Sequence, residues 1–202
     1  MLVTGIKSKP VYAPLRADTR GRFHLMLGMG AGAVALMRVL GELEDTAPQA
    51  LGATRVLLVP DANAPALDEF RKLQVAEVRA FADGAALLAE FTTVLERSLM
   101  GTRLYVAGPE SFIGLAMKIA LQFDLNKDEI RAEEMGTLAR RVYCIHCRAT
   151  TEDVRTNIVR CVDCARWLLV RDHYSRRLAA YMGVMVDAEA PGELPPIKEV
   201  FV

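Results

Sequence analysis

The chain has few aromatic residues, no net charge and no long apolar segment, and each absence removes a class of protein. Aromatic side chains make up 6% of the 202 residues, and 25 basic groups balance 25 acidic groups. Such a chain lacks the strongly basic, aromatic surface that is typical of nucleic-acid-binding proteins. The longest apolar run, residues 25–37, is too short and too rich in glycine to span a bilayer. We therefore expect neither a nucleic acid nor a membrane as a partner.

The N-terminus also lacks the apolar stretch of a secretory signal peptide. We therefore expect a cytoplasmic protein, in which cysteine thiols stay reduced. Hydrophobic residues make up 52% of the chain, which is enough to bury a core of ordinary size.

Strand-like and helix-like patterns alternate over residues 1–138. An apolar run from Phe23 ends in glycines, and residues 34–43 then carry apolar side chains at helical spacing. Similar strand-like runs recur at residues 55–59 and 104–107, each followed by a helical pattern. This alternation predicts an α/β fold with a doubly wound, mostly parallel sheet, in a Rossmann-like domain over residues 1–138.

The first glycine-rich turn, GMGAGA at residues 28–33, fits the dinucleotide fingerprint G-x-G-x-x-[G/A] between a strand and a helix. Gly28, Gly30 and Gly32 would let a pyrophosphate approach the backbone at a helix N-terminus. The same glycines would also suit a tight strand-to-helix turn with no ligand. Asp61 lies farther along the chain than the usual ribose-binding acid. Both interpretations stay open on these residues alone.

A second turn carries a family resemblance. The segment LYVAGPESFIGLAMKIALQFDLNKDEIRAEEM, residues 104–135, resembles the last strand–helix–strand unit of the ferredoxin-reductase NAD(P) domain. In that family a C-G-P turn closes the site where nicotinamide meets flavin, and here Ala107 replaces the cysteine before Gly108 and Pro109. Ala33 and Val34 stand where the family usually has Thr-Pro. Only about twenty residues precede the first strand, so we expect no flavin-binding barrel. The resemblance implies a site for NAD(P)H, with NADPH as one candidate, at Gly28, Gly30, Gly32, Gly108 and Pro109.

All four cysteines lie in one segment, spaced as Cys144-x2-Cys147-x13-Cys161-x2-Cys164. Two Cys-x-x-Cys knuckles can point four thiolates at one tetrahedral site. Disulfides do not suit a reducing compartment, and the spacing fits neither a thioredoxin motif nor a plant-type [2Fe–2S] cluster. Zinc and a single rubredoxin-like iron both fit, and the missing glycine after each knuckle favours zinc. We expect a metal ribbon of two or three strands over residues 139–182.

Arginines surround these cysteines. Residues 140–177 hold nine arginines, no lysine and four acidic residues. Their charge would offset four thiolates on one divalent ion and would suit an acidic partner. The remaining residues, 183–202, are expected to form an interface arm.

The segment DHYSRRLAAYMGVMVDAE, residues 172–189, follows the ribbon and resembles the small DmmA-like subunit of bacterial dimethylamine monooxygenase. The resemblance extends over essentially the full chain. It implies an accessory or electron-transfer-assembly subunit, partnered by a haem-binding oxygenase subunit and a flavin and [2Fe–2S] reductase subunit. The haem subunit would demethylate a secondary amine oxidatively with electrons from NADPH.

The resemblance assigns no catalytic residue to this chain. Two alternatives stay open: an NAD(P)H-binding redox component with a rubredoxin-like iron, and a free-standing regulatory zinc-ribbon protein.

Overall fold

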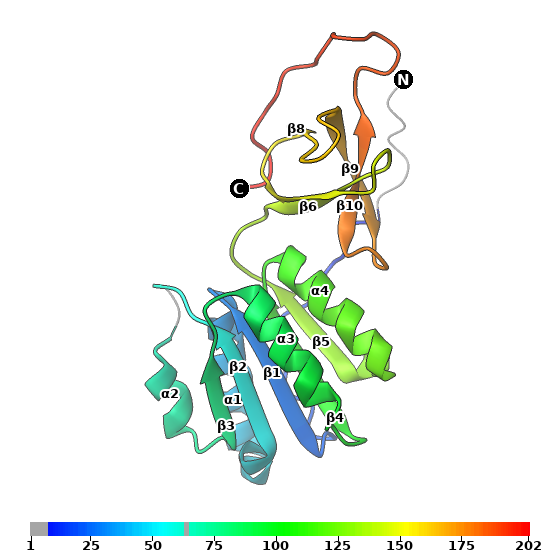
Figure 1. The fold of residues 1–202 in the computed structure, drawn as a ribbon. Coiled ribbons are helices and arrows are strands. Elements are labelled where there is room, and N and C mark those ends of the chain that lie inside the picture. The colour runs from blue at the N-terminus through cyan, green and yellow to red at the C-terminus, as the bar shows by residue number, and fades with distance from the viewer. Residues whose placement is uncertain (1–7, 63–64) are drawn as a thin grey trace. The chain divides into compact units, whose positions relative to one another are not determined.

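The computed structural model describes residues 8–62 and 65–202, which fall into two compact units (Figure 1). The α/β unit is Tyr12–Gly136. The ribbon unit combines residues 8–11 with Thr137–Val202. Each unit has its own sheet, and each is described by itself below.

The sheet of the α/β unit has five strands in the order β3-β2-β1-β4-β5, and every neighbouring pair is parallel. This arrangement confirms the doubly wound α/β fold expected from the sequence. The chain runs outward from β1 to β3, returns to the other side of β1 with β4, and ends with β5. The strands are β1 (Phe23–Met29), β2 (Thr54–Val59), β3 (Glu77–Ala80), β4 (Thr102–Gly108) and β5 (Ile130–Glu134).

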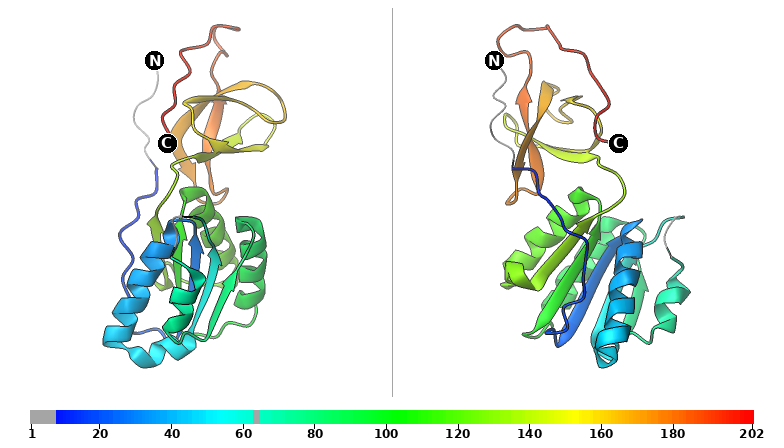
Figure 2. Two further views of the ribbon diagram at one scale, coloured as in Figure 1. Left: turned by 90° about the vertical axis from the view of Figure 1, so that its left-hand side faces the viewer. Right: turned by 180° about the vertical axis from the view of Figure 1, so that it is seen from behind.

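Helices cover both faces of this sheet, α3 and α4 on one face and α1 and α2 on the other (Figures 1 and 2). Side chains alternate along each strand, so Leu25 and Leu27 of β1 face α3 and α4, whereas Met26 faces α1. The helices are α1 (Gly32–Thr46), α2 (Leu67–Lys72), α3 (Gly84–Leu95) and α4 (Glu110–Ala120), with short 3₁₀ turns η1 (Pro48–Ala53), η2 (Leu121–Phe123) and η3 (Lys127–Glu129).

Residues 12–22 run along the α/β unit before β1 and are anchored by Asp18. The Asp18 side chain is 2% exposed and accepts hydrogen bonds from Arg20, Arg103 and Arg131. The guanidinium of Arg20, followed by that of Arg131, holds the pKa of Asp18 far below its usual range, although burial opposes the shift. This buried carboxylate ties the segment to β4 and β5.

The sheet of the ribbon unit has five strands in the order β7-β6-β10-β9-β8. The expectation of two or three strands is therefore wrong. The last strand in sequence inserts between β6 and β9, parallel to β6 and antiparallel to β9. Such a pairing between distant segments leaves no local signal. The strands are β6 (Arg140–Cys144), β7 (Thr150–Val154), β8 (Ile158–Arg160), β9 (Trp167–Ser175) and β10 (Ala180–Met185).

Gly183 lets β10 fit into this position. A Cβ there would lie 2.7 Å from Cγ1 of Val142 and 3.0 Å from Cδ1 of Leu168. Residues 8–11 belong to the same unit, because Ser8 exchanges hydrogen bonds with the backbone of Tyr174 in β9.

The C-terminal residues fold back onto the ribbon unit. The backbone N–H groups of Val200 and Phe201 donate to the carbonyl oxygen of Arg155, each at 2.9 Å. The Phe201 ring covers one side of the Arg140 guanidinium at 3.8 Å, and a second cation–π contact joins Arg140 to Tyr181 at 3.9 Å. The arm thus packs on its own chain, and an additional contact with another subunit stays a prediction.

No helix within residues 8–62 and 65–202 is long and apolar enough to cross a membrane.

Candidate functional site

The two cysteine knuckles have the same backbone pattern. In the first, Cys144 N–H donates to Ala149 O, and Arg148 N–H donates to Cys144 O, both at 2.9 Å. In the second, Cys161 N–H donates to Arg166 O at 2.9 Å, and Ala165 N–H donates to Cys161 O at 3.2 Å. Each knuckle therefore turns its two cysteines to the same side.

The residue after each knuckle is left-handed although it is not glycine. Arg148 has φ +69° and Ala165 has φ +56°. A left-handed conformation costs an ordinary L-residue about 1–2 kcal/mol. Both turns therefore form without a glycine after the knuckle. The absence of that glycine is a weak argument against iron.

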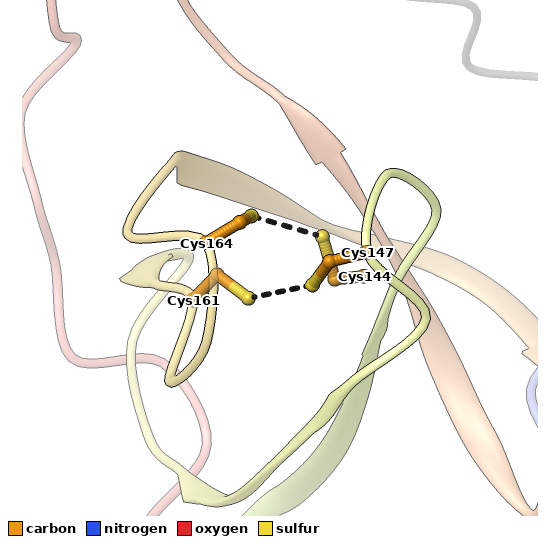
Figure 3. Close-up of side chains that lie close together, drawn as sticks. All are labelled: Cys144, Cys147, Cys161 and Cys164. Atoms are coloured by element: carbon orange, nitrogen blue, oxygen red, sulfur yellow. Dashed lines mark hydrogen bonds between the residues drawn. The ribbon is translucent and has the colours of Figure 1, made fainter.

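The four sulfur atoms converge on one point (Figure 3). Sγ of Cys144 lies 3.8 Å from Sγ of Cys164, and Sγ of Cys147 lies 3.5 Å from Sγ of Cys161. All four sulfurs lie within 4.8 Å of one another, and all four cysteines are free. A tetrahedral ion with metal–sulfur bonds of about 2.3 Å places its ligands about 3.8 Å apart. The cluster therefore has the dimensions of a four-sulfur metal site and can hold an ion.

Burial differs between the two cysteines of each knuckle. Cys144 and Cys161 are buried, whereas Cys147 and Cys164 are half-buried. An ion held by all four would therefore lie close to the surface of the ribbon unit.

Backbone amides and one arginine favour thiolates at this site. The Arg166 backbone N–H, and then its guanidinium, lower the pKa of Cys164 to about 6. The Ala149 N–H acts in the same direction on Cys147, but burial and the neighbouring groups Cys161, Cys164 and Asp163 outweigh it and raise the pKa of Cys147. Amide N–H groups that point at the sulfurs suit a bound, deprotonated cysteine cluster.

The histidines take no ligand position in this cluster. His146 lies inside the first knuckle with its side chain exposed, and His173 is also exposed. His24 is buried in the α/β unit, where its Nδ1 lies 3.3 Å from the Tyr105 hydroxyl. His24 is therefore a core residue of β1.

The structure brings the two predicted nucleotide turns together at the carboxyl ends of β1 and β4. These strands are neighbours, with Gly28 opposite Ala107. A Cβ on Gly32 would lie 2.1 Å from the carbonyl oxygen of Ala107, so the start of α1 packs directly on β4. Pro109 precedes α4 at the end of the second turn. The predicted residues thus share one edge of the sheet, at the point where the strand order reverses.

Sequence reasoning did not anticipate the acidic character of this edge. Asp61 follows β2, and its Oδ2 lies 2.6 Å from the position that a Cβ on Gly30 would occupy. Glu110 begins α4 and is buried, and Glu133 is the second-last residue of β5. The available signal was an acidic residue at or just after the end of several strands.

Comparison with known proteins assigns the family. Residues 4–130 match the N-terminal domain, and residues 141–184 the C-terminal domain, of the family described as dimethylamine monooxygenase subunit DmmA-like. The chain belongs to the DmmA-like family. This membership confirms the resemblance seen in the sequence, and the two matched regions lie mainly in the α/β unit and the ribbon unit, respectively.

A curated relative is the heme-dependent oxidative N-demethylase delta subunit of Ectopseudomonas mendocina (strain ymp). It is 29% identical over 170 residues, which cover 83% of this chain and 82% of the relative.

Solved structures resemble the chain more distantly. A ferredoxin reductase of carbazole 1,9a-dioxygenase is 16% identical with a TM-score of 0.43, over 61% of this chain and 34% of that one. The FAD/NAD-binding domain of a nitric oxide dioxygenase from Vibrio cholerae is 21% identical with a TM-score of 0.42, over 57% and 52%. The DmmA-like chain thus spans about a third to a half of these two solved structures.

Proposed function

We propose that this DmmA-like protein is an accessory subunit of a multi-subunit, haem-dependent monooxygenase that demethylates a secondary amine oxidatively. The observation that carries the proposal is the similarity to an N-demethylase delta subunit over 170 residues, a length greater than that of either unit alone. The partners would be a haem-binding oxygenase subunit and a flavin and [2Fe–2S] reductase subunit that draws electrons from NADPH.

We propose zinc as the ion of the ribbon unit, held by Cys144, Cys147, Cys161 and Cys164. The sulfur spacings and the inward-pointing amides support a tetrahedral ion of this kind. The bound ion would fix the two knuckles and so hold their outer surface in one shape.

This outer surface, which we call the knuckle face, consists of the exposed residues Ile145, His146, Arg148, Val162, Asp163 and Arg166, of which two are basic and one is acidic. Ile145 is 47% exposed and Val162 is 71% exposed, at equivalent positions of the two knuckles. Exposed aliphatic groups beside arginines suit a protein surface of acidic character. We propose that the knuckle face binds an acidic surface of another subunit of the complex.

A second candidate function is electron transfer through iron at the same site. It is favoured by the half-burial of Cys147 and Cys164, which would place the ion close to the surface and to a redox partner. Metal analysis and the visible spectrum of the natively purified chain separate the two. Ferric iron bound by four sulfurs absorbs strongly in the visible range, whereas zinc is colourless.

The test of the proposed function is reconstitution of this chain with a haem-binding oxygenase subunit and a flavin and [2Fe–2S] reductase subunit of an oxidative N-demethylase. We expect haem and flavin absorbance to co-elute with the tagged chain, and NADPH-dependent formaldehyde release to fall when the chain is omitted. Unchanged assembly and unchanged demethylation without the chain would overturn the proposal.

The knuckle face has its own test in the same reconstitution. Arg148→Glu should weaken assembly at least tenfold while metal content is kept, because it reverses a charge on this surface. Arg176→Glu makes the same change on an exposed arginine of the β9–β10 turn and serves as the matched control. Equal assembly by the two variants would exclude the knuckle face as the contact.

A further inference from the structure

A cavity of about 270 Å³ lies in the α/β unit at the amino ends of its strands, the edge opposite the two glycine turns. Its walls come from the first residues of β1 and β2, from η1 before β2, and from the end of α3 with the loop that follows. Figure 1 shows α3 ending at this edge of the sheet. The cavity shares no lining residue with the glycine turns or the cysteine cluster.

The inner wall of this cavity is apolar. Phe23 and Leu25 line it from β1, and Val94 lines it from α3. Leu99, in the loop after α3, also lines the cavity and is 64% exposed, so it lies at the mouth. Gly52 adds no side chain to the wall formed by η1, and a Cβ there would have no atom within 4 Å. The cavity therefore suits a ligand that can bury an apolar group.

Among the described residues, two arginines and no acidic residue line the same cavity. Arg55 pairs with Leu25 in the neighbouring strand, so its side chain lies on the face of the sheet that α3 covers. Its contact with Glu77, at 3.6 Å, joins two partly exposed side chains, and a pair of this kind is weak. Arg97 is exposed and forms no ion pair within residues 8–62 and 65–202. Both guanidinium groups can therefore accept an anionic partner.

The C-terminal end of α3 is the feature that opposes an anion here, because a helix carries a partial negative charge at this end. Ser98 satisfies two of the last carbonyl groups of α3. Its Oγ donates to Val94 O at 2.9 Å, and its backbone N–H donates to Leu95 O at 3.0 Å. Arg97 adds a full positive charge directly after the helix. The residues that line the cavity therefore carry a net positive charge.

We propose that this cavity binds a small amphiphilic carboxylate, whose apolar chain or ring enters between β1 and α3 while its carboxylate pairs with Arg97 and Arg55. A guanidinium can donate two parallel hydrogen bonds to a carboxylate, which favours this anionic group. The volume of about 270 Å³ is slightly below the roughly 300–1,000 Å³ of sites for drug-sized ligands. The ligand therefore has on the order of ten non-hydrogen atoms.

Calorimetric titration of the full-length chain with octanoate tests this proposal. Octanoate combines an apolar chain with one carboxylate, and we expect saturable binding with a Kd of about 1 mM or below. Octylammonium has the same chain and the opposite charge, and it should bind at least tenfold more weakly. Acetate lacks the chain and should bind equally weakly. No saturable binding of octanoate up to about 10 mM, or equal binding of octanoate and octylammonium, overturns the proposal.

Two adjacent exposed residues test the location of the ligand. Leu99→Glu places a negative charge at the mouth of the cavity and should weaken octanoate binding at least tenfold. Met100→Glu makes the same change on a side chain that is 94% exposed and does not line the cavity, so it should leave binding unchanged. Equal binding by these two variants would place octanoate elsewhere and contradict the proposal.

A second pair of variants tests the positive charge. Arg97→Gln should weaken octanoate binding about two- to fivefold, which is the effect of one exposed ion pair. Arg71→Gln, on an exposed arginine of α2 that does not line the cavity, should have no effect. Equal binding by these two variants would contradict the role of Arg97.

A protein partner is the other possible occupant, and the same variants distinguish it. Weaker assembly of Leu99→Glu with the other subunits, together with no octanoate binding by the wild type, would mean that a partner side chain fills the cavity. The proposal of a small carboxylate would then be wrong. The proposed subunit role would remain intact, because assembly and demethylation by the wild type test that role.

Discussion

The α/β unit and the ribbon unit differ in what can hold each of them together. Among the residues that the structure describes, buried clusters of fifteen and fourteen residues cover the two faces of the α/β sheet. The ribbon unit has one cluster of eight buried residues, two of which are the cysteines Cys144 and Cys161. A small sheet with so few apolar side chains gains much of its stability from a metal or another cross-link. The comparison predicts that one unit depends on its core and the other on its ion.

The largest expected effect is the loss of a metal ligand. Cys144→Ser should release the ion and unfold the ribbon unit, because a structural zinc contributes on the order of 10 kcal/mol to such a fold. The α/β unit should remain folded, since its clusters contain none of the ligands. Metal analysis and hydrogen exchange over both units check this expectation.

The adjacent Ile145→Ser provides the control for that variant, because Ile145 is exposed and offers no ligand. Full metal content in Cys144→Ser would show that this thiol does not hold the ion. Simultaneous unfolding of both units would show that they are not independent.

A smaller effect is expected at the buried charge of the α/β unit. Asp18→Asn leaves three arginines without their shared carboxylate and should cost about 3 kcal/mol of unfolding free energy. Denaturant unfolding measures this loss. A cost below about 1 kcal/mol would mean that the arginines find other partners.

The same carboxylate predicts a dependence on pH. The folded pKa of Asp18 is lowered, so its contribution is fully present above the unfolded value of about 4 and is lost as the pH falls below that value. The wild type should therefore lose more unfolding free energy than Asp18→Asn as the pH falls from about 5 to below about 4. Parallel losses in the two proteins would contradict the assignment.

Two glycines of the same helix provide a matched pair. Gly32→Ala should destabilise the α/β unit by about 2–3 kcal/mol, because its Cβ would overlap the β4 backbone. At Gly41, no atom lies within 4 Å of the position of a new Cβ. Gly41→Ala should therefore raise the unfolding free energy by about 0.5–1 kcal/mol, because alanine has the higher helix propensity. Thermal unfolding of both variants checks that Gly32→Ala lowers stability and Gly41→Ala raises it. Equal effects would mean that the start of α1 does not pack directly on the β4 backbone.

The smallest expected effect is in the second knuckle. Ala165→Gly should stabilise the metal-loaded ribbon unit by about 1 kcal/mol, because Ala165 is left-handed. Ala149→Gly, two residues after the first knuckle and at a position without positive φ, should instead lose stability. The rate of metal release to a chelator measures both, and a faster release from Ala165→Gly would argue against the strained turn.

Much of the α/β fold and the ligand set could be predicted because their signals are local. Apolar periodicity marks β1 and α1 within the segment that forms them, and two residues separate the cysteines of each knuckle. The place of β10 beside β6 was missed because a parallel pairing between segments forty residues apart leaves no pattern in either one. The acidic edge was missed because its residues come from different strand ends.

The sequence by itself determined the alternation of strands and helices, the two knuckles and the excess of arginine around them, since short-range spacing and composition set all three. Tertiary structure decided that the four sulfurs lie within 4.8 Å, that Asp18 joins residues up to 113 positions away, and that Asp61 lies beside Gly30. The physical reason is that distances between sequence-remote atoms depend on how strands pair and helices pack, and no single segment encodes those contacts.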